Sequence, residues 1–153
     1  MKRNACILLF YLLATVSYGQ PAPTRIYLVR NGSRFLNLMQ FRTTLDPNKE
    51  IKVKNSGYTL IETDADSLGI IIDTTYPDSQ GLIIQPKPVF VNVEKGKSYF
   101  FKLGPVPAFR GSSQIDVDEM TERAFWLYVG LNQLSDTPTR YLLTNANGLT
   151  KVR

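Results

Sequence analysis

Residues 89–104 read VFVNVEKGKSYFFKLG, and this stretch decides the fold class. Apolar side chains alternate with other residues on both sides of a polar segment, at Val89, Val91 and Val93 and again at Tyr99, Phe101 and Leu103. A period of two is typical of a β-strand with one buried face. The polar segment contains Gly96, and glycine reaches positive φ without steric cost. We therefore predict two strands joined as a hairpin by a tight turn at residues 94–97.

Gly96-Lys97-Ser98 also closes the Walker A phosphate-binding signature. That signature needs another glycine five positions before Gly96, and a helix after the lysine whose N-terminus faces the phosphate. Val91 stands at the first of these places, and the strand-forming Tyr99-Phe100-Phe101 follows the lysine. We therefore predict a turn with Gly96 at positive φ and no nucleotide site.

The rest of the chain from Gln20 onward shows the same alternation in short segments. The predicted strands are 25–30, 35–45, 50–54, 58–63, 70–72, 82–84, 114–118 and 140–144, and Asp46-Pro47-Asn48-Lys49 predicts a type I turn. Many short strands separated by turns are typical of a sandwich or barrel. Because the strands differ in length, we predict an all-β fold, a two-sheet antiparallel β-sandwich of the immunoglobulin-like kind.

Residues 118–131 fit two structures. A helix would gather five residues on one face, namely Met120, Ala124, Leu127, Tyr128 and Leu131. The alternative is one helical turn capped by Thr121 and then a strand. β-branched and aromatic residues are enriched in strands, so the composition favours the second structure, with only a short helix near 119–124.

The first nineteen residues differ from the rest of the chain. Lys2 and Arg3 precede an apolar run at 5–16, and Ser17-Tyr18-Gly19 places small residues before Gln20. This is the plan of a secretory signal peptide, and the apolar run is shorter than the roughly 20 residues that span a bilayer. We expect cleavage near Gly19-Gln20, export to the periplasm or the extracellular medium, and one mature domain at 20–153 without a transmembrane segment. A retained membrane anchor is the alternative.

The charge of the mature chain is modest. Without Lys2 and Arg3 the formal net charge falls from +5 to +3, which does not indicate a nucleic-acid partner. Four arginines alternate with apolar residues near the mature N-terminus, namely Arg25, Arg30, Arg34 and Arg42. This spacing favours the solvent side of strands, and the alternative is a patch for anions or lipid headgroups.

The composition limits catalysis. The chain has no histidine, and its one cysteine, Cys6, lies in the leader, which excludes Ser–His–Asp and Cys–His chemistry and zinc sites of those residues. Two acidic groups, 64–66 and 116–119, could hold a cation, but solvated loop and strand positions explain them better. We predict a protein that is not an enzyme and has no metal and no cofactor. A secreted hydrolase with two catalytic carboxylates is the alternative.

Aromatic side chains offer one binding hypothesis. Phe109 and Arg110 lie in a stretch rich in proline and glycine, and Trp126 and Tyr128 lie in the ambiguous segment. Together with Tyr76 these rings could form a stacking platform for a sugar or a peptide. Burial of Trp126 and Tyr128 in the core is the competing interpretation.

Three short motifs carry a resemblance to a family. Val93-x-x-Gly96-x-x-Tyr99-Phe100, the opening Arg25-Ile26-Tyr27-Leu28-Val29-Arg30 and Asn55-Ser56-Gly57-Tyr58 resemble motifs of uncharacterised bacterial envelope proteins, many of them small lipoproteins. The resemblance covers about residues 25–104 and implies an immunoglobulin-like β-sandwich with no catalytic residues. This chain departs from the pattern, because it has no lipid-anchoring cysteine at the end of its leader and carries a longer insertion at 64–88.

The function expected from these features is binding. We predict an exported, non-enzymatic cell-envelope protein that recognises an envelope protein or a glycan. A second hypothesis is a structural module that pairs with its partner through a sheet edge.

Overall fold

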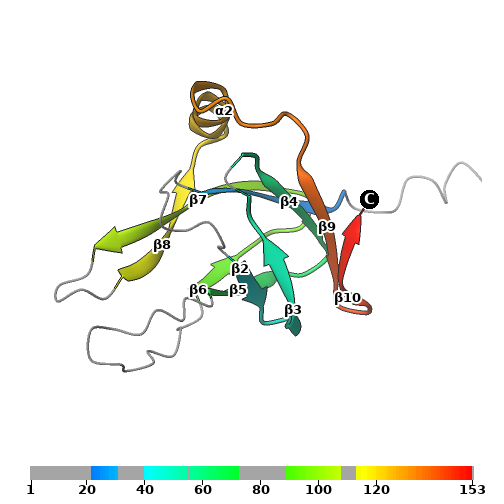
Figure 1. The fold of residues 1–153 in the computed structure, drawn as a ribbon. Helices are drawn as coiled ribbons and strands as arrows, with labels where there is room; N and C mark the ends of the chain where they lie inside the picture. Colours follow the sequence, from blue (N-terminus) through cyan, green and yellow to red (C-terminus); the bar gives the residue numbers. More distant parts are fainter. Residues whose placement is uncertain (1–21, 31–39, 55, 73–88, 108–112, 153) are drawn as a thin grey trace, which may run out of the picture.

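The computed structural model describes residues 22–30, 40–54, 56–72, 89–107 and 113–152. The elements, in chain order, are β1 (Thr24–Arg30), β2 (Gln40–Thr43), β3 (Asp46–Lys52), β4 (Thr59–Thr63), β5 (Ser67–Ile72), β6 (Val89–Asn92), β7 (Ser98–Pro107), β8 (Ser113–Met120), α2 (Glu122–Leu131), β9 (Thr139–Thr144) and β10 (Gly148–Val152) (Figure 1).

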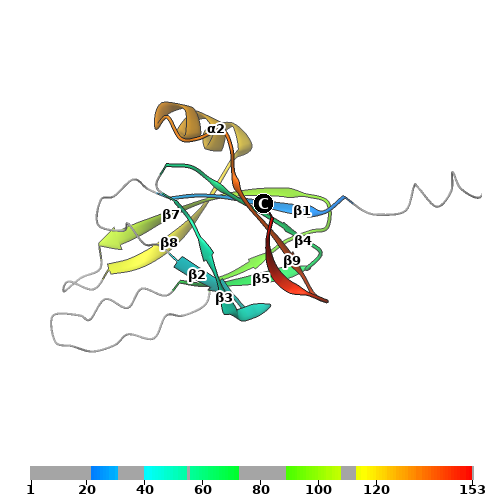
Figure 2. The same ribbon diagram turned by 45° about the vertical axis from the view of Figure 1, so that its right-hand side comes forward.

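The strands form two sheets. The larger sheet has six strands in the order β10-β9-β4-β1-β7-β8, and the smaller has four in the order β3-β2-β5-β6 (Figures 1 and 2). The predicted two-sheet β-sandwich is confirmed. The pairing is not antiparallel throughout, because β1 pairs with β7, and β4 with β9, in parallel.

The main core lies between the two sheets. On β1, Ile26 and Leu28 point into it and meet Ile61 of β4 and Phe101 of β7, all of them buried. The smaller sheet contributes buried residues from each of its strands or from their ends, namely Phe41, Ile51, Leu68, Ile70 and Val93. Burying one such side chain stabilises the fold by about 1.5–3 kcal/mol, so this core is the principal source of stability.

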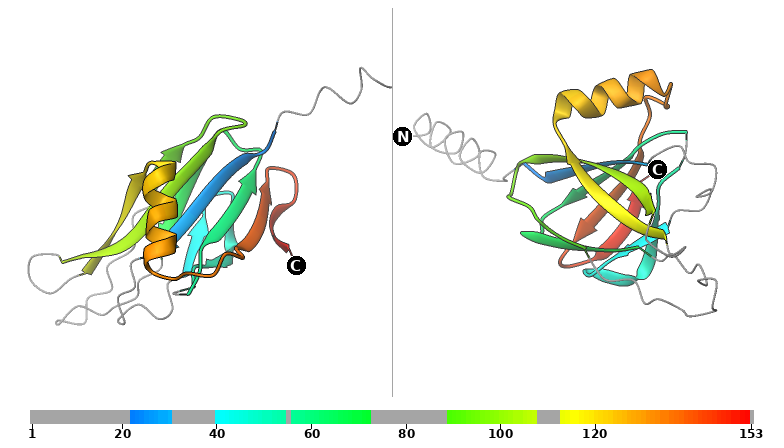
Figure 3. Two further views of the ribbon diagram at one scale, coloured as in Figure 1. Left: turned by 90° about the horizontal axis from the view of Figure 1, so that it is seen from above. Right: turned by 90° about the vertical axis from the view of Figure 1, so that its left-hand side faces the viewer.

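A second core lies on the opposite face of the larger sheet, beneath α2. Val29 of β1 and Phe100 of β7 alternate with the residues of the first core and face the helix, where they meet Tyr58, Phe125 and Val129. Figure 3 shows α2 lying across this sheet. The central strands of the larger sheet are therefore buried on both faces.

The predicted hairpin at 89–103 is wrong. β6 pairs with β5 in the smaller sheet, whereas β7 pairs with β1 and β8 in the larger one. The tight turn itself is confirmed, with Gly96 at a φ of 79° and the Lys97 N–H donating to the Glu94 carbonyl over 3.2 Å. The reason lies in β7, where both Phe100 and Phe101 are buried, which requires cover on both faces. Only an interior position in the larger sheet provides that cover.

The predicted strand after Thr121 is also wrong, because residues 122–131 form α2. Thr121 is the N-cap, and its Oγ1 accepts a hydrogen bond from the Ala124 N–H over 3.2 Å. The helix buries Phe125 and Val129, four residues apart on one stripe. The strand propensity of these residues does not decide their structure, because the free energy gained by packing this stripe against a sheet is larger than that weak local preference.

The type I turn predicted at residues 46–49 is wrong, because the chain turns at Thr44 and Leu45 instead. Asp46 instead begins β3, which is an end strand of the smaller sheet. Pro47 fits there because an end strand leaves backbone positions that need no ladder donor.

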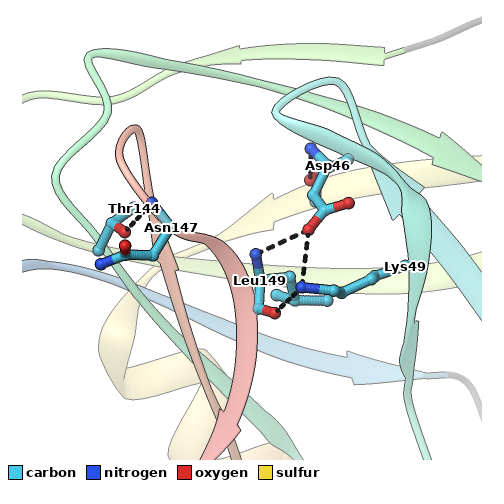
Figure 4. A network of polar contacts seen from close by, with 6 residues as sticks. Asp46, Lys49, Thr144, Asn147 and Leu149 are labelled. Carbon is cyan, nitrogen blue, oxygen red and sulfur yellow. Dashed lines mark hydrogen bonds and ion pairs between the residues drawn. The ribbon is translucent and has the colours of Figure 1, made fainter.

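Asp46 ties the two sheets together (Figure 4). Its Oδ2 accepts a hydrogen bond from the Leu149 N–H of β10 over 2.9 Å and lies 3.3 Å from Lys49 Nζ. Lys49 in turn donates to the Leu149 carbonyl over 2.9 Å. Leu149 thus pairs with β9 in its own sheet while it is held by two side chains of β3 in the other.

The four arginines at positions 25, 30, 34 and 42 do not all face solvent as predicted. Arg25 is exposed, but Arg30, at the end of β1, is 2 % exposed. Arg30 pairs in register with the buried Leu103, so strand alternation turns its side chain toward the interior. Arg34 lies outside the described residues.

Candidate functional site

Helix α2 is apolar around most of its circumference, although only one stripe is buried. Its charged residues, Glu122 and Arg123, stand in the first turn. Phe125 and Val129 are buried, whereas Trp126 is 40 %, Leu127 55 % and Leu131 82 % exposed. We call the exposed side, formed by Trp126, Leu127, Gly130 and Leu131 together with Arg123 one turn before Leu127, the α2 outer face.

The helix is fixed at both ends. At its start Thr121 caps the first turn. At its end Asn132 donates through Nδ2 to the Tyr128 carbonyl over 2.8 Å. The segment that follows is held by the Ser135 N–H, which donates to the Ser56 carbonyl over 2.8 Å. The α2 outer face is therefore presented on a rigid element and needs little ordering before it binds.

Trp126 rests on a cluster of aromatic rings. Its centroid lies 5.8 Å from Tyr27, 5.5 Å from Tyr58 and 5.2 Å from Phe125, each in an edge-to-face arrangement. Such pairs add about 0.5–1.5 kcal/mol each beyond area burial. The indole Nε1–H donates to Glu122 Oε1 over 3.4 Å. The ring is thus held in one orientation while part of it stays exposed to solvent.

Tyr128 has a different role. Its hydroxyl donates to the Arg30 carbonyl over 3.0 Å, and its ring is half-buried against the second core. Residues two apart on a helix are separated by about 200°, so Trp126 and Tyr128 leave α2 on different sides. Phe109, Arg110 and Tyr76, the other members of the predicted platform, lie outside the described residues.

Burial beneath α2 also affects Tyr58. Its hydroxyl donates to the Asp136 carbonyl over 3.2 Å. Burial, with smaller contributions from Tyr27 and Asp136, raises the pKa of the Tyr58 hydroxyl above its ordinary value. Tyr58 is therefore a neutral hydrogen-bond donor at physiological pH, and it fixes the loop after α2.

The sequence around α2 is acidic in a basic chain, although Glu119, which pairs in register with Phe101, lies on the sheet face away from α2. Between residues 118 and 136 the sequence has four acidic side chains, Asp118, Glu119, Glu122 and Asp136, against one basic side chain, Arg123. Asp118 lies 3.6 Å from Lys102 Nζ, which offsets one of these charges. The whole chain has a formal net charge of +5, so this segment of the sequence differs from the chain in the sign of its charge.

The acidic residues elsewhere are engaged in separate structural contacts. Glu62 lies between two arginines, 3.4 Å from Arg25 Nε and 3.0 Å from Arg140 Nη2. Asp64 accepts a hydrogen bond from the Asn145 N–H over 2.9 Å, and Asp66 lies 3.3 Å from Lys95 Nζ. Across the described part of the chain, no three acidic, histidine or cysteine side chains gather as a metal site would require.

The smaller sheet ends in a strand with exposed apolar residues. On β6, Val89 is 38 % and Phe90 67 % exposed. Phe90 pairs in register with Gly69 of β5, and its ring covers that glycine. The exposure of Phe90 thus has a structural explanation within the molecule.

None of the helices in the described ranges has the length and apolarity needed to cross a membrane.

The exposed leucines of α2 were missed at the sequence level. The helical alternative placed Leu127 and Leu131 on the inward face, but the inward face is rotated toward Phe125 and Val129. Phe125 could have indicated this, because it is the aromatic side chain of α2 that carries no polar atom, whereas Trp126 and Tyr128 each have a group that needs a hydrogen-bond partner.

Comparison with known proteins adds no assignment: no protein-family model matches this sequence, and no curated protein or solved structure is significantly similar to it.

Proposed function

We propose that this chain is an exported, non-enzymatic binding module of the cell envelope, and that it recognises a partner protein through the α2 outer face. One observation carries this proposal. Helix α2 exposes three large apolar side chains, Trp126, Leu127 and Leu131, while it buries only Phe125 and Val129. Contiguous exposed apolar side chains bordered by polar residues are typical of interaction sites.

The chemistry of this face suits a protein interface. Its exposed residues combine one tryptophan with two leucines, Leu127 and Leu131, on adjacent turns of one helix. Tryptophan is among the residues most enriched at the centres of interfaces. Because the aromatic cluster holds Trp126 in place, binding loses little side-chain entropy there.

A protein partner is favoured over a glycan. A sugar site needs convergent polar groups beside its aromatic ring. The indole N–H of Trp126 already donates to Glu122, and Leu127 and Leu131 offer no side-chain hydrogen bond, which leaves Arg123 as the polar side chain of this face. The face can therefore bury apolar surface but has few groups to orient a hydroxylated ligand.

The other two hypotheses have less support. A hydrolase would use carboxylates that act on the substrate, whereas Glu62 contacts two arginines, Asp64 accepts from a backbone N–H and Asp66 contacts a lysine. The hypothesis of pairing through the β6 edge relies on the exposed Phe90. The position of Phe90 is already explained within the molecule, because its ring covers Gly69. Export rests on the leader at residues 1–19.

Affinity capture from the envelope fraction of the host tests the proposal. The bait is the mature chain, residues 20–153, as wild type, as Leu127→Gln/Leu131→Gln and as Val89→Gln. The last variant changes an equally apolar exposed residue on the smaller sheet, away from α2. We expect a protein that wild type and Val89→Gln retain and the double variant loses. Equal capture by all three baits would contradict the proposal.

A further inference from the structure

We infer that Ser67 is an O-glycosylation site, whose hydroxyl receives a sugar from a phosphate-linked glycosyl donor after export and before the chain folds. This modification goes beyond the proposed function. It rests on the export that the proposed function includes, and it does not depend on the α2 outer face. Three properties of residues 66–68 support the site, namely their sequence pattern, the outward position of Ser67 and the burial of Leu68.

Residues 66–68 read Asp66-Ser67-Leu68. An aspartate, then a serine or threonine, then an aliphatic residue is the acceptor pattern of one class of bacterial protein O-glycosylation. Asp73, Asp78 and Asp136 also precede a serine or threonine, but the residue that follows is Thr75, Gln80 or Pro138 and not an aliphatic one. A pattern of three residues does not define a site by itself, so the position of these residues in the fold has to be compatible with a bound sugar.

The fold presents the Ser67 side chain to solvent. Ser67 is the first residue of β5, and the next residue, Leu68, points into the core. Strand alternation therefore places Ser67 on the outer face of the smaller sheet, where it is exposed. It has a neighbouring strand on one side, where it pairs with Asn92 of β6, because β2 pairs only with residues 70–72 of β5. Within the described part of the chain its Oγ makes no hydrogen bond, so a sugar there would replace no contact of the fold.

The two residues that flank Ser67 differ in their exposure. The side chain of Asp66 is 79 % exposed and lies 3.3 Å from Lys95 Nζ, whereas Leu68 is fully buried in the main core. An enzyme that recognises all three residues must therefore meet them before Leu68 is buried. Attachment thus takes place on the unfolded exported chain, after which Leu68 packs into the core and the sugar stays outside.

A sugar at Ser67 would also cover apolar surface that the molecule leaves exposed. Phe90 of β6 is 67 % exposed and pairs in register with Gly69, the next outward residue of β5 after Ser67. Ser67 and Phe90 are therefore diagonal neighbours on one face of the sheet, about 7–8 Å apart. Between them Gly69 has no side chain that would keep the sugar away from the ring. Packing the CH face of the sugar on Phe90 removes apolar surface from water, which is favourable.

The transfer forms one bond and breaks one. Ser67 Oγ attacks the anomeric carbon of the donor sugar, and the bond from that carbon to the phosphate oxygen of the donor breaks. The phosphate leaves with the electron pair of that bond, and the serine proton passes to a base of the host glycosyltransferase. The donor is a sugar carried on a lipid or nucleotide phosphate of the host.

Mass spectrometry of the full chain isolated from its native host tests the site. We expect the exported chain to carry a sugar on the peptide that contains Ser67, and we expect Ser67→Ala to lose the whole of this added mass. Ser67→Thr keeps a hydroxyl and should keep the sugar, whereas Asp66→Asn should lose most of it. Thr137→Ala is the matched control, because Thr137 is an exposed hydroxyl residue after an aspartate without an aliphatic neighbour, and it should be modified like wild type.

The order of events has its own test. A peptide of residues 62–72 and the folded, unmodified chain of residues 20–153 are each incubated with the membrane fraction of the host. The peptide should gain the sugar, and the folded chain should not, because its Leu68 is buried. Equal modification of both would contradict attachment before folding.

Several results would overturn the site. They are an exported chain without added mass, a sugar that persists in Ser67→Ala, and an added mass that a phosphatase removes. The state of the N-terminus separates this inference from the proposed function. An unmodified chain that begins at Gln20 in the envelope fraction shows that only the glycosylation site is wrong. An unmodified chain that keeps residues 1–19 in the cytosol contradicts the export on which both depend.

Discussion

Asp46 shows how one carboxylate can join two sheets and give stability a dependence on pH. The hydrogen bond from the Leu149 N–H, followed by the contact with Lys49, lowers the pKa of Asp46 below its ordinary value. A carboxyl group with a lowered folded pKa stabilises the fold above its unfolded pKa of about 4, and this contribution is lost as pH falls through the folded value.

Asp46→Asn should therefore lower the melting temperature at pH 7, and the difference from wild type should shrink as the pH falls below about 4. Thermal unfolding followed by circular dichroism between pH 7 and pH 2.5 would measure this. Asp66→Asn is the matched control, since Asp66 is mostly exposed beside Lys95. A constant difference across the whole pH range would rule out this role of Asp46.

Gly69 is needed for close packing in the smaller sheet. An added Cβ would collide with Thr44 Cγ2, and it would lie 2.9 Å from Thr44 Oγ1 and 3.0 Å from Phe90 Cε1. Thr44 cannot move freely, because its Oγ1 accepts a hydrogen bond from the Gly69 N–H. Gly69→Ala should destabilise the protein by about 1–3 kcal/mol in urea unfolding. A loss within about 0.5 kcal/mol, as at ordinary surface positions, would contradict this account.

Gly130 is the opposite case among the glycines. It lies inside a helix with open space where a Cβ would stand. Gly130→Ala should therefore stabilise the fold by about 0.5–1 kcal/mol in urea unfolding, because alanine is the better helix former. If the variant is less stable than wild type, Gly130 has a structural role in the chain that its surroundings do not show.

At the scale of elements, α2 depends on one ring. Phe125 is fully buried among Tyr27, Tyr58, Phe100 and Trp126, at centroid distances of 5.2–5.9 Å. Phe125→Ala should cost about 3–5 kcal/mol of stability and loosen the helix, seen as a red shift of the Trp126 emission. Leu131→Ala removes an exposed side chain of the same helix and should stay within about 0.5 kcal/mol. Similar losses in the two variants would mean that α2 is not anchored through Phe125.

Local patterns predicted several elements correctly. The alternation in β1, β4 and β9, and the positive φ at Gly96, follow from short-range rules that involve a few neighbouring residues. The hairpin and the helix were predicted wrongly because their outcome depends on distant partners. β7 pairs with β1, about 70 residues earlier in the chain. Helix α2 is stabilised by a sheet whose strands come from other segments of the chain. β10, which lies against Asp46, was not predicted at all.

The candidate site shows the same limit. Trp126 and Tyr128 were named from composition, and both contact the aromatic cluster of the second core. Which apolar residues of α2 remain exposed could not be deduced, because its apolar residues occupy more than one side of the helix, which therefore fits a sheet in more than one rotation. The orientation found, with Phe125 inward and Leu131 outward, depends on the rings that β1, β7 and Tyr58 contribute.

At the scale of the whole molecule, the proposed export would determine which chain performs the function. The first nineteen residues end in Ser17-Tyr18-Gly19, which predicts cleavage and a mature N-terminus at Gln20. N-terminal sequencing of the protein isolated from the host should begin at Gln20. Recovery of the intact leader from the native host would instead support the retained anchor.

The central claim is that the α2 outer face binds another protein. A photo-crosslinking amino acid placed at position 131 in cells, with the same residue at position 89 as the matched control, tests this claim most directly. We predict a defined protein adduct from position 131 that position 89 does not give, and that Leu127→Gln diminishes. The absence of any adduct at 131, or the same adducts at both positions, would contradict the account.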